Sequence, residues 1–464
     1  MVNIIVFYLL GDLKMYLKRT IDSYLKEWAD DSEHKPLLLR GARQIGKTTA
    51  VRHLAESFES FIEINFEKTP ALGRIFEGGF DIDRILFELE TNTKRKITPG
   101  KTLIFFDEIQ ACPKAISALR YFYEDKQQLH VIATGSLLEF AFEDISDFGV
   151  GRIRSMFMYP LSFAEFISAM DADITMQYAR KSSFDNPFFS TGHEMMLDYL
   201  KTFFIVGGMP AAVATYIKYK SYVKAQRQLM DILATLKSDF DKYKTKITPD
   251  VIRSAFTSVI RQTCEKFNFS DEYSSISHHQ SKASTTLLER AKIIHRISGT
   301  YGNGIPIGSD INPKQNKFIL LDIGLYLCEA KLDVANWILD PGAKFVTRGK
   351  MAEMFAALEI LKNASPYDDS QLFYWHRESK NSNAEVDYVV QYRNRILPIE
   401  VKSGKSGSMT SLRMMMESKN LSLAVRTSEE NFGTLANHVR IIPLYLIGEY
   451  DRILRAAGDG NDSL

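Results

Sequence analysis

A chain of 464 residues is too long to fold around one hydrophobic core, and the usual domain size predicts about three domains. Its 58 Lys and Arg residues balance 57 Asp and Glu residues. The net charge therefore gives no information about a nucleic-acid partner, and local basic patches are not excluded. The cysteines Cys112, Cys264 and Cys328 are widely spaced, which excludes a disulfide framework and favours a reducing cytoplasm. No apolar run reaches about 18 residues, so we expect no membrane span.

The first domain is expected to begin near Met15, because residues 16–25 have the apolar spacing of an amphipathic helix. The first ten residues are also apolar, but they have neither a basic leading segment nor a cleavage-site pattern, so a signal peptide is not predicted. Whether residues 1–14 result only from the choice of start codon, with Met15 as the true first residue, is left open.

A glycine-rich octapeptide follows the apolar strand predicted over residues 36–40. Residues 41–48 fit the phosphate-binding P-loop pattern GxxxxGK[ST]. In this pattern the glycines let backbone amides surround the phosphates, Lys47 reaches the β and γ oxygens, and Thr48 offers its hydroxyl to magnesium. Lys47 is therefore also a catalytic candidate. The pattern predicts that ATP and Mg²⁺ bind at Gly41, Ala42, Arg43, Gln44, Ile45, Gly46, Lys47, Thr48 and Thr49.

Helix and strand patterns alternate after the P-loop, as in an α/β sheet. They predict a helix and then two strands, over residues 49–58, 61–66 and 103–106. The last strand ends in Asp107 and Glu108, at the edge where open α/β sheets bind ligands. We expect Asp107 to share the magnesium shell with Thr48 and Glu108 to polarise the attacking water, which favours hydrolysis over binding alone. An ordinary helix cap is the alternative interpretation of this pair.

A further strand, predicted over residues 130–134, runs towards Ser136. If it lies between the P-loop strand and the strand that ends at Asp107, Thr134 or Ser136 is placed to sense the γ-phosphate, and a plain loop turn is the alternative. Arg152 precedes the last predicted strand of the sheet. It is a candidate to neutralise transition-state charge in its own subunit or a neighbour's, and a surface arginine is an equal alternative.

Six segments occur in a specific order: 41–48, Asp107-Glu108-Ile109-Gln110, Thr134-Gly135-Ser136, Gly151-Arg152, Pro160-Leu161-Ser162-Phe163 and Gly207-Gly208-Met209-Pro210. This order resembles one prokaryotic family of AAA-type ATPases, in which an ATPase domain precedes a C-terminal domain of unknown function. The resemblance covers nearly the whole chain from about Met15. It implies an AAA+ sheet with Walker A at residues 41–48, Walker B at 103–108 and a polar sensor near Ser136. It implies no substrate.

The middle of the chain has helical periodicity, followed by patterns for a helix over residues 287–297 and a strand over 317–322. This order suggests a winged-helix module, which the resemblance also implies. Arg290, Lys292 and Arg296 on the predicted helix are compatible with DNA phosphate contacts. A solvated helix face is the favoured alternative.

Two strand patterns near the C-terminus are separated by a predicted turn at residues 393–394. This turn places Asp387 opposite Glu400 and Glu385 opposite Lys402, with all four on one face. The apolar residues expected on the other face are Val386, Tyr388, Val390, Leu397, Ile399 and Val401. The register is sharp because a one-residue slip would destroy it, and Pro398, which has no amide to donate, is its weak point.

Opposed carboxylates need a cation between them, so this cluster suggests a divalent metal site. Its form resembles the PD-(D/E)xK nuclease core, in which a helix adds another acid, and Glu353 is the matching candidate. The resemblance implies that Asp387 and Glu400 bind magnesium and that Lys402 orients the attacking water or stabilises charge, with Glu385 as an extra acid. A cross-strand ion network on an inactive nuclease-like fold is an equal alternative.

The predicted fold class is α/β: an AAA+ P-loop parallel sheet, a helical and winged-helix middle, and a C-terminal mixed α/β nuclease-like domain. The expected boundaries are 15–165 for the ATP-binding domain, 166–225 for a helical lid, 226–340 for the connector and winged-helix-like domain, 341–450 for the nuclease-like domain and 451–464 for a tail.

The leading hypothesis is a Mg²⁺-dependent ATPase that switches the attached domains between states. The alternatives are an ATP-gated, metal-dependent nuclease acting on DNA and a slow nucleotide-dependent interaction scaffold. DNA, a protein partner and a second copy of the chain stay open as partners.

Overall fold

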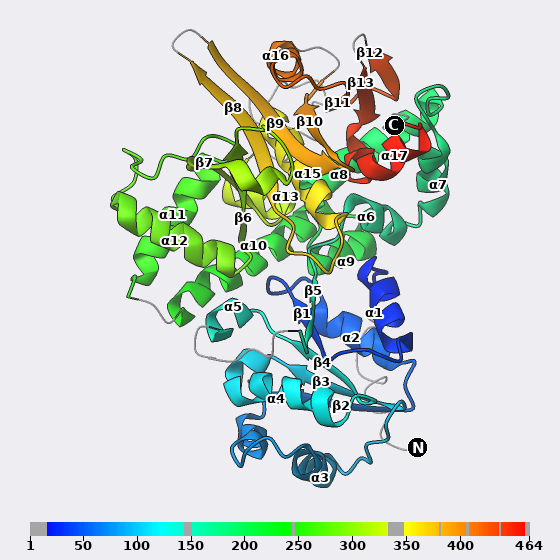
Figure 1. Cartoon of the computed structure of the whole chain (residues 1–464), viewed down its shortest axis with the longest axis vertical. Coiled ribbons are helices and arrows are strands. Elements are labelled where there is room, and N and C mark those ends of the chain that lie inside the picture. Colours follow the sequence, from blue (N-terminus) through cyan, green and yellow to red (C-terminus); the bar gives the residue numbers. More distant parts are fainter. Residues whose placement is uncertain are drawn as a thin grey trace.

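The computed structural model describes residues 16–142, 151–243, 246–332, 348–379, 382–404, 408–435 and 438–459. Residues 1–14, whose origin the sequence leaves open, lie outside this part of the chain. Figure 1 shows a parallel sheet at one end of the molecule, a larger mixed sheet at the other, and helices between them.

The N-terminal sheet has five parallel strands in the order β2-β3-β4-β1-β5. Their bounds are β1 Leu37–Arg40, β2 Ser60–Asn65, β3 Thr102–Asp107, β4 His130–Thr134 and β5 Arg154–Phe157. The strand expected between the P-loop strand and the Asp107 strand is therefore confirmed at that place, because β4 pairs with both β1 and β3. This order brings the ends of β1, β3 and β4 together at one edge of the sheet.

Helices cover both faces of this sheet. The bounds are α1 Ile21–Asp30, α2 Lys47–Ala55, α3 Ile82–Thr93, α4 Pro113–Asp125 and α5 Leu138–Ala141, with short 3₁₀ turns at Pro70–Phe76 and Ile109–Ala111. Successive strand residues point to opposite faces, so Leu103 and Phe105 pack in one core while Ile104 and Phe106 pack in the other. The continuous apolar run of β3 follows from this burial on both faces.

A helical layer follows the sheet in the chain and lies between the two sheets in Figure 1. Its bounds are α6 Phe163–Ala169, α7 Asp173–Lys181, α8 Ser190–Val206, α9 Pro210–Tyr219, α10 Tyr222–Ser238, α11 Pro249–Arg261, α12 His278–Arg290 and α13 Ile323–Glu329, with a 3₁₀ turn at Asp239–Lys242. Local sequence motifs determine where several of these helices begin. A Ser162–Glu165 capping box begins α6, and Pro210 occupies the first turn of α9.

Within the described ranges, no single helix is long and apolar enough to cross a membrane, although α8 and α9 together meet the length and composition requirement with a bend of 119° between them.

The two motifs Pro160-Leu161-Ser162-Phe163 and Gly207-Gly208-Met209-Pro210 meet in space. Leu161 and Gly208 are joined by a 2.7 Å backbone hydrogen bond from the Leu161 amide, and a Cβ on Gly208 would lie 2.3 Å from the Leu161 carbonyl oxygen. Asp322, at the start of α13, accepts a 2.6 Å hydrogen bond from the Gly208 amide. This close approach requires glycine at position 208 and links the P-loop domain to the rest of the chain.

The second sheet has eight strands in the order β12-β13-β11-β10-β9-β8-β6-β7. Their bounds are β6 Ile294–Thr300, β7 Ile311–Leu320, β8 Leu372–Ser379, β9 Ser382–Tyr392, β10 Arg395–Val401, β11 Ala424–Ser428, β12 Gly433–Leu435 and β13 Val439–Pro443. The accompanying helices are α15 Arg348–Lys362, α16 Thr410–Ser418 and α17 Tyr450–Ala456, with 3₁₀ turns at Ile307–Asp310 and Leu444–Glu449. The β6–β7 hairpin of the expected winged-helix segment is thus one edge of the C-terminal sheet.

The predicted register of the β9–β10 hairpin is confirmed from the pair Tyr392 and Arg395 to the pair Tyr388 and Ile399, where the ladder ends before the pair predicted for Glu385 and Lys402. The ladder runs to the pair Tyr388 and Ile399, which leaves Asp387 and Glu400 as the next facing positions. Pro398 lies opposite Val389, within the ladder.

One assignment of faces in this hairpin is wrong. Val386 packs with Trp375 and Val389 in one core, whereas Tyr388 packs in the other. The pairing of β8 with β9 shifts register between Phe373 and Trp375, so a bulge reverses which face the side chains of β9 occupy.

Two further expectations are corrected. The helix predicted over residues 287–297 is instead α12 followed by strand β6, because a Ser277–Gln280 capping box begins the helix earlier and Lys292 has a left-handed φ of 57° after its end. The tail expected from residue 451 begins with helix α17, whose Ile453 and Leu454 are buried.

Candidate functional site

The P-loop joins β1 to α2, and each of its two glycines is required by a different feature of the backbone. Gly41 has a φ of 142°, and a Cβ there would lie 2.3 Å from the Met158 carbonyl oxygen. Gly46 has a φ of 98° and caps the N-terminus of α2. Both conformations favour glycine, and together they direct the loop amides and the positive end of the helix dipole to one place.

Asp107, at the end of β3, is the centre of a buried polar network. Its side chain accepts hydrogen bonds from the Thr48 hydroxyl at 3.1 Å, the Asn65 amide at 2.9 Å and the Thr134 hydroxyl at 2.6 Å. Asp107 is 5% exposed. The donors come from α2, β2 and β4, so the strand order itself assembles this network. No sequence motif singled out Asn65.

Lys47 is buried and folded back over the loop. Its ammonium group donates to the carbonyl oxygens of Gly41 at 2.8 Å and Ala42 at 2.7 Å. Burial lowers the pKa of Lys47 to about 8, against the opposing effect of Glu108 and Asp107. A bound polyphosphate would supply the negative charge that the buried ammonium lacks.

Arg43 connects the P-loop to the helical layer. Its Nε donates to the Ser136 hydroxyl at 3.1 Å, and its guanidinium pairs with Asp239 at 2.7 Å. Ser136 in turn donates to Glu108 at 3.2 Å. A continuous chain of polar contacts therefore runs from Glu108 at the end of β3, through Ser136 and Arg43, to Asp239, which is 2% exposed beyond the end of α10.

These groups open onto a cavity of about 1010 Å³. The predicted residues that line it are Arg43, Gln44, Gly46, Lys47, Thr48, Thr49 and Glu108. Its other wall was not predicted and is largely apolar, made by Tyr16 and Leu17 before α1 and by Pro210, Ala214 and Ile217 of α9. A cavity with phosphate-binding amides at one wall and apolar side chains at the other suits a nucleotide.

Three other predicted P-loop residues point away from this cavity. Ile45 is fully buried, and Gly41 and Ala42 line a small cavity of about 10 Å³ shared with Lys292 and His295. Their expected contribution to phosphate binding is through their backbone groups.

The residues around Thr48 fit a magnesium ion. Thr48 lines the cavity, and its hydroxyl lies 3.1 Å from the buried Asp107 carboxylate. Hydroxyl and carboxylate oxygens are the ligands that Mg²⁺ prefers.

Arg152 does not reach the P-loop of its own chain. It pairs with Glu124 near the C-terminal end of α4 and comes before the first residue of β5. Because the strands are parallel, this places Arg152 at the edge of the sheet opposite the P-loop. The expectation of a catalytic role in its own subunit is therefore wrong.

Each of the three basic residues proposed for DNA contacts has a partner within the protein. Arg290 donates to the Glu139 carbonyl oxygen at 3.1 Å, Lys292 pairs with Asp369 at 2.8 Å, and Arg296 pairs with Glu289 at 2.6 Å. Arg290 therefore ties the end of α12 to α5 of the P-loop domain.

In the C-terminal cluster, an unexpected lysine lies between two of the acids. Lys317 of β7 is 1% exposed, and its ammonium group lies 3.0 Å from Glu353 and 2.6 Å from Glu385. Burial opposes its charge, but Glu353 and Glu385 hold the pKa of Lys317 well above its ordinary value. The sequence showed Lys317 only as the first residue of a predicted strand.

The remaining predicted residues of the cluster are only partly satisfied, because the buried Oε2 atom of Glu400 has no hydrogen-bond partner within the described ranges. Lys402 pairs with Glu400 at 2.5 Å, and Asp387 accepts a 2.7 Å hydrogen bond from the Val401 amide. Burial, and then Asp387, raise the pKa of Glu400 to about 7. Within the described ranges, no three His, Cys, Asp or Glu side chains are arranged to hold a metal ion. With Lys317 already bonded to Glu353 and Glu385, the cluster does not fit a magnesium site.

Comparison with known proteins agrees with the geometry of the N-terminal site. Residues 33–167 match the family described as "AAA domain", and residues 197–336 and 348–447 each match a domain of unknown function (DUF8612 and DUF4143). No curated protein matches the chain. Residues 33–167 are thus similar to an AAA domain, whereas the C-terminal match assigns no nuclease activity.

Three solved structures are similar to the chain at low identity. The Walker-type ATPase of Pyrococcus abyssi is 14% identical, with 68% of this chain and 96% of that chain covered and a TM-score of 0.43. A signal transduction ATPase with numerous domains (STAND) from Pyrococcus horikoshii, with a tetratricopeptide repeat sensor, is 12% identical, covers 77% and 47%, and has a TM-score of 0.26. PCH-2 of C. elegans is 15% identical, covers 60% and 68%, and has a TM-score of 0.23.

Proposed function

We propose that the chain hydrolyses ATP with Mg²⁺ and uses the cycle to change the contacts between its P-loop domain and its helical layer. The observation that carries the proposal is the Asp107 carboxylate, hydrogen-bonded to Thr48 of the P-loop and followed by Glu108 at the wall of the same cavity. A site for binding alone would not need a second carboxylate beside the phosphates.

Each residue has a separate task in this proposal. Lys47 gives up its two carbonyl contacts and neutralises the β and γ oxygens, while the loop amides hold the phosphates at the start of α2. Thr48 and Asp107 would hold Mg²⁺, which supplies charge stabilisation to the phosphoryl group when bound. Glu108 orients the attacking water and accepts its proton.

The polar chain that ends at Asp239 supports the second part of the proposal. Ser136 contacts both Glu108 and Arg43, so a γ-phosphate that displaces Glu108 also alters the hydrogen bond to Arg43. Arg43 is then free to strengthen or release its contact with Asp239. In this way the state of the nucleotide is transmitted to the end of α10 through side-chain contacts alone.

Two substitutions test the chemistry. Lys47→Ala should abolish ATP binding, and Glu108→Gln should keep ATP binding while lowering turnover by about 100-fold or more. Lys101→Ala, which removes only an exposed ion pair with Glu59, is the matched control and should leave turnover unchanged. Turnover by Glu108→Gln equal to that of the native chain would remove Glu108 from the mechanism.

The switch is tested with Asp239→Asn, which keeps the shape of the side chain and removes its charge. Limited proteolysis of the native chain should differ between a non-hydrolysable ATP analogue and ADP. The variant should bind both nucleotides with little change yet lose this difference. If the variant keeps the native difference in cleavage, the path through Arg43 and Asp239 is not the route of coupling.

No nuclease function is proposed for the C-terminal cluster, because Lys317 already neutralises two of its acids.

A further inference from the structure

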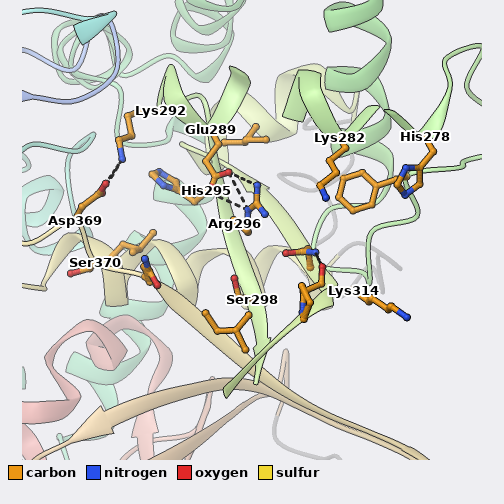
Figure 2. A pocket seen from close by; sticks show the side chains of 17 residues that line it. His278, Lys282, Glu289, Lys292, His295, Arg296, Ser298, Lys314, Asp369 and Ser370 are labelled. Atoms are coloured by element: carbon orange, nitrogen blue, oxygen red, sulfur yellow. Dashed lines mark hydrogen bonds and ion pairs between the residues drawn. The ribbon is translucent and has the colours of Figure 1, made fainter. Parts of the chain in front are cut away.

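A second large cavity lies between α12 and the β6–β7 hairpin. Its volume is about 750 Å³, within the roughly 300–1,000 Å³ of ordinary ligand pockets. Figure 2 shows the side chains around it, with His278 and Lys282 of α12 and Lys314 of β7 towards one side and Glu289, His295 and Arg296 towards the other. We call this cavity the α12 groove.

Positive charge is in excess in the α12 groove. Its wall carries the four cations Lys282, Lys292, Arg296 and Lys314 against two acids, Glu289 and Asp369. Both acids are already in ion pairs, Glu289 with Arg296 and Asp369 with Lys292. Lys282 and Lys314 are exposed, and among the described residues neither ammonium group has an ion-pair partner. The surplus charge therefore comes from one lysine of α12 and one of β7.

The groove also offers flat rings and an unused polar atom. The rings of Phe269 and His278 lie 5.5 Å apart at its wall. The Nε2 atom of His295 is buried and has no hydrogen-bond partner within the described ranges. Burial, and then Lys292, lower the pKa of His295 to about 3, so this ring is neutral near pH 7. A buried polar atom without a partner, at the wall of a cavity, is the position that a ligand group would fill.

We propose that the α12 groove binds a single nucleic-acid strand, with backbone phosphates at Lys282 and Lys314 and a base near Phe269. A cationic groove with aromatic side chains along it is the arrangement by which proteins hold single strands. His295 Nε2 gives the base edge or ribose a hydrogen bond. The walls are a helix and the β-hairpin that follows it, but the bases are read inside a cavity, where the paired bases of a duplex cannot enter. This activity does not depend on ATP hydrolysis.

The test is fluorescence anisotropy of the full chain with labelled 20-nucleotide DNA and RNA strands and with a DNA duplex, without nucleotide and at two salt concentrations. The double variant Lys282→Glu, Lys314→Glu should weaken strand binding at least tenfold and reduce the slope of log K against log salt by about 1.4, at roughly 0.7 per phosphate. Lys101→Glu, Lys126→Glu changes the net charge equally on the P-loop domain and should bind as the native chain does.

Phe269→Leu keeps an apolar side chain against the core and removes the ring, so it should weaken strand binding with little change in salt dependence. Lys47→Ala should bind strands normally, which separates this proposal from the ATPase proposal. Comparison of the DNA and RNA strands identifies the source of the phosphates.

Three results would overturn the proposal. They are no binding to any strand, equal binding by the double variant, and competition by inorganic phosphate at the concentration of strand nucleotides, which would make the groove a small-anion site. Preferred binding of the duplex would likewise contradict a site that reads unpaired bases.

Discussion

Replacing Lys317 with methionine separates the two interpretations of the C-terminal carboxylate cluster. Methionine keeps the length and apolar volume of the side chain and removes its charge. In the native chain the ammonium group lies 3.0 Å from Glu353 and 2.6 Å from Glu385, in a site where Lys317 itself is 1% exposed. If this lysine holds the cluster together, its loss should destabilise the C-terminal sheet strongly.

The expected cost follows from the exposure of the two partners. The side chain of Glu353 is 17% exposed, so without Lys317 it would be a largely buried acid with no cation beside it. The side chain of Glu385 is 36% exposed, so water compensates most of the loss of its ion pair with Lys317. Removing one partner of a buried pair costs about 3–5 kcal/mol. Because Glu353 can take up a proton instead, we expect the lower end, about 3 kcal/mol, or a fall in Tm of roughly 6–12 °C.

The pH dependence of the variant has a definite sign. Burial already raises the pKa of Glu353 in the native chain against the effect of Lys317, and without the lysine it should rise further. A carboxyl group with a raised folded-state pKa stabilises the fold below its unfolded pKa, and this stability is lost as the pH rises towards the folded value. Because Glu353 of the native chain already has a pKa of about 8, the difference from the native chain should change little between pH 5 and pH 7 and should grow as the pH rises above about 8.

Thermal unfolding followed by circular dichroism measures these differences. Lys350→Met is the matched control, because its ion pair with Glu265 is more exposed and should contribute less than about 1 kcal/mol. The double variant Lys317→Met, Glu353→Gln should recover part of the loss, since no buried charge remains. Two results would contradict this reasoning. They are a Tm of Lys317→Met equal to that of Lys350→Met, and cleavage of DNA by the native chain with Mg²⁺ or Mn²⁺. Either would mean that Lys317 does not hold the cluster together in place of a metal ion.

Three further results are expected. The affinity for ATP should fall as the pH rises through about 8, because only protonated Lys47 neutralises the phosphates. In a titration with a fluorescent ATP analogue, Lys47→Arg should remove this pH dependence. An affinity of the native chain that does not change with pH would contradict the prediction. Gly41→Ala should abolish ATP binding and lower the Tm, because the new Cβ would lie 2.3 Å from the Met158 carbonyl oxygen; native-like binding would contradict the loop geometry. Arg152→Ala should change turnover less than about twofold, and a larger fall at high protein concentration would place Arg152 at a neighbouring subunit's site.

The P-loop site was predictable because its chemistry is local in the sequence. Eight consecutive residues form the loop, and Asp107 follows a strand whose unbroken apolar run indicates burial on both faces. Parallel strands with such runs end at one edge, so the approach of Thr48 to Asp107 followed from pattern alone. The apolar wall from α9 could not be predicted in this way, since nothing about Pro210 or Ala214 distinguishes a cavity wall from a core.

The C-terminal cluster shows the opposite case. The hairpin register follows from a two-residue turn and is confirmed, because the two strands are neighbours in the sequence. Lys317 reaches the cluster from β7, which is separated from β9 by β6 and β8 in the sheet and by more than sixty residues in the chain. A long-range contact of this kind leaves no periodic trace. Similarly, the β9 bulge that moves Val386 to the other face depends on the partner strand β8.

The α12 groove and the P-loop share a wall, and this has a consequence for how the two proposed ligands affect each other. Lys292 and His295 line the groove, and they also line the small cavity formed with Gly41 and Ala42 at the back of the P-loop. A base that bonds to His295 therefore acts on a side chain packed behind the phosphate-binding loop. Coupling between two binding sites is reciprocal, so any factor by which a strand changes the affinity for ATP must equal the factor by which ATP changes the affinity for the strand. An inequality of these two factors at equilibrium would mean that the strand binds elsewhere as well, since one strand site and one ATP site form a closed thermodynamic cycle in which the two factors are equal.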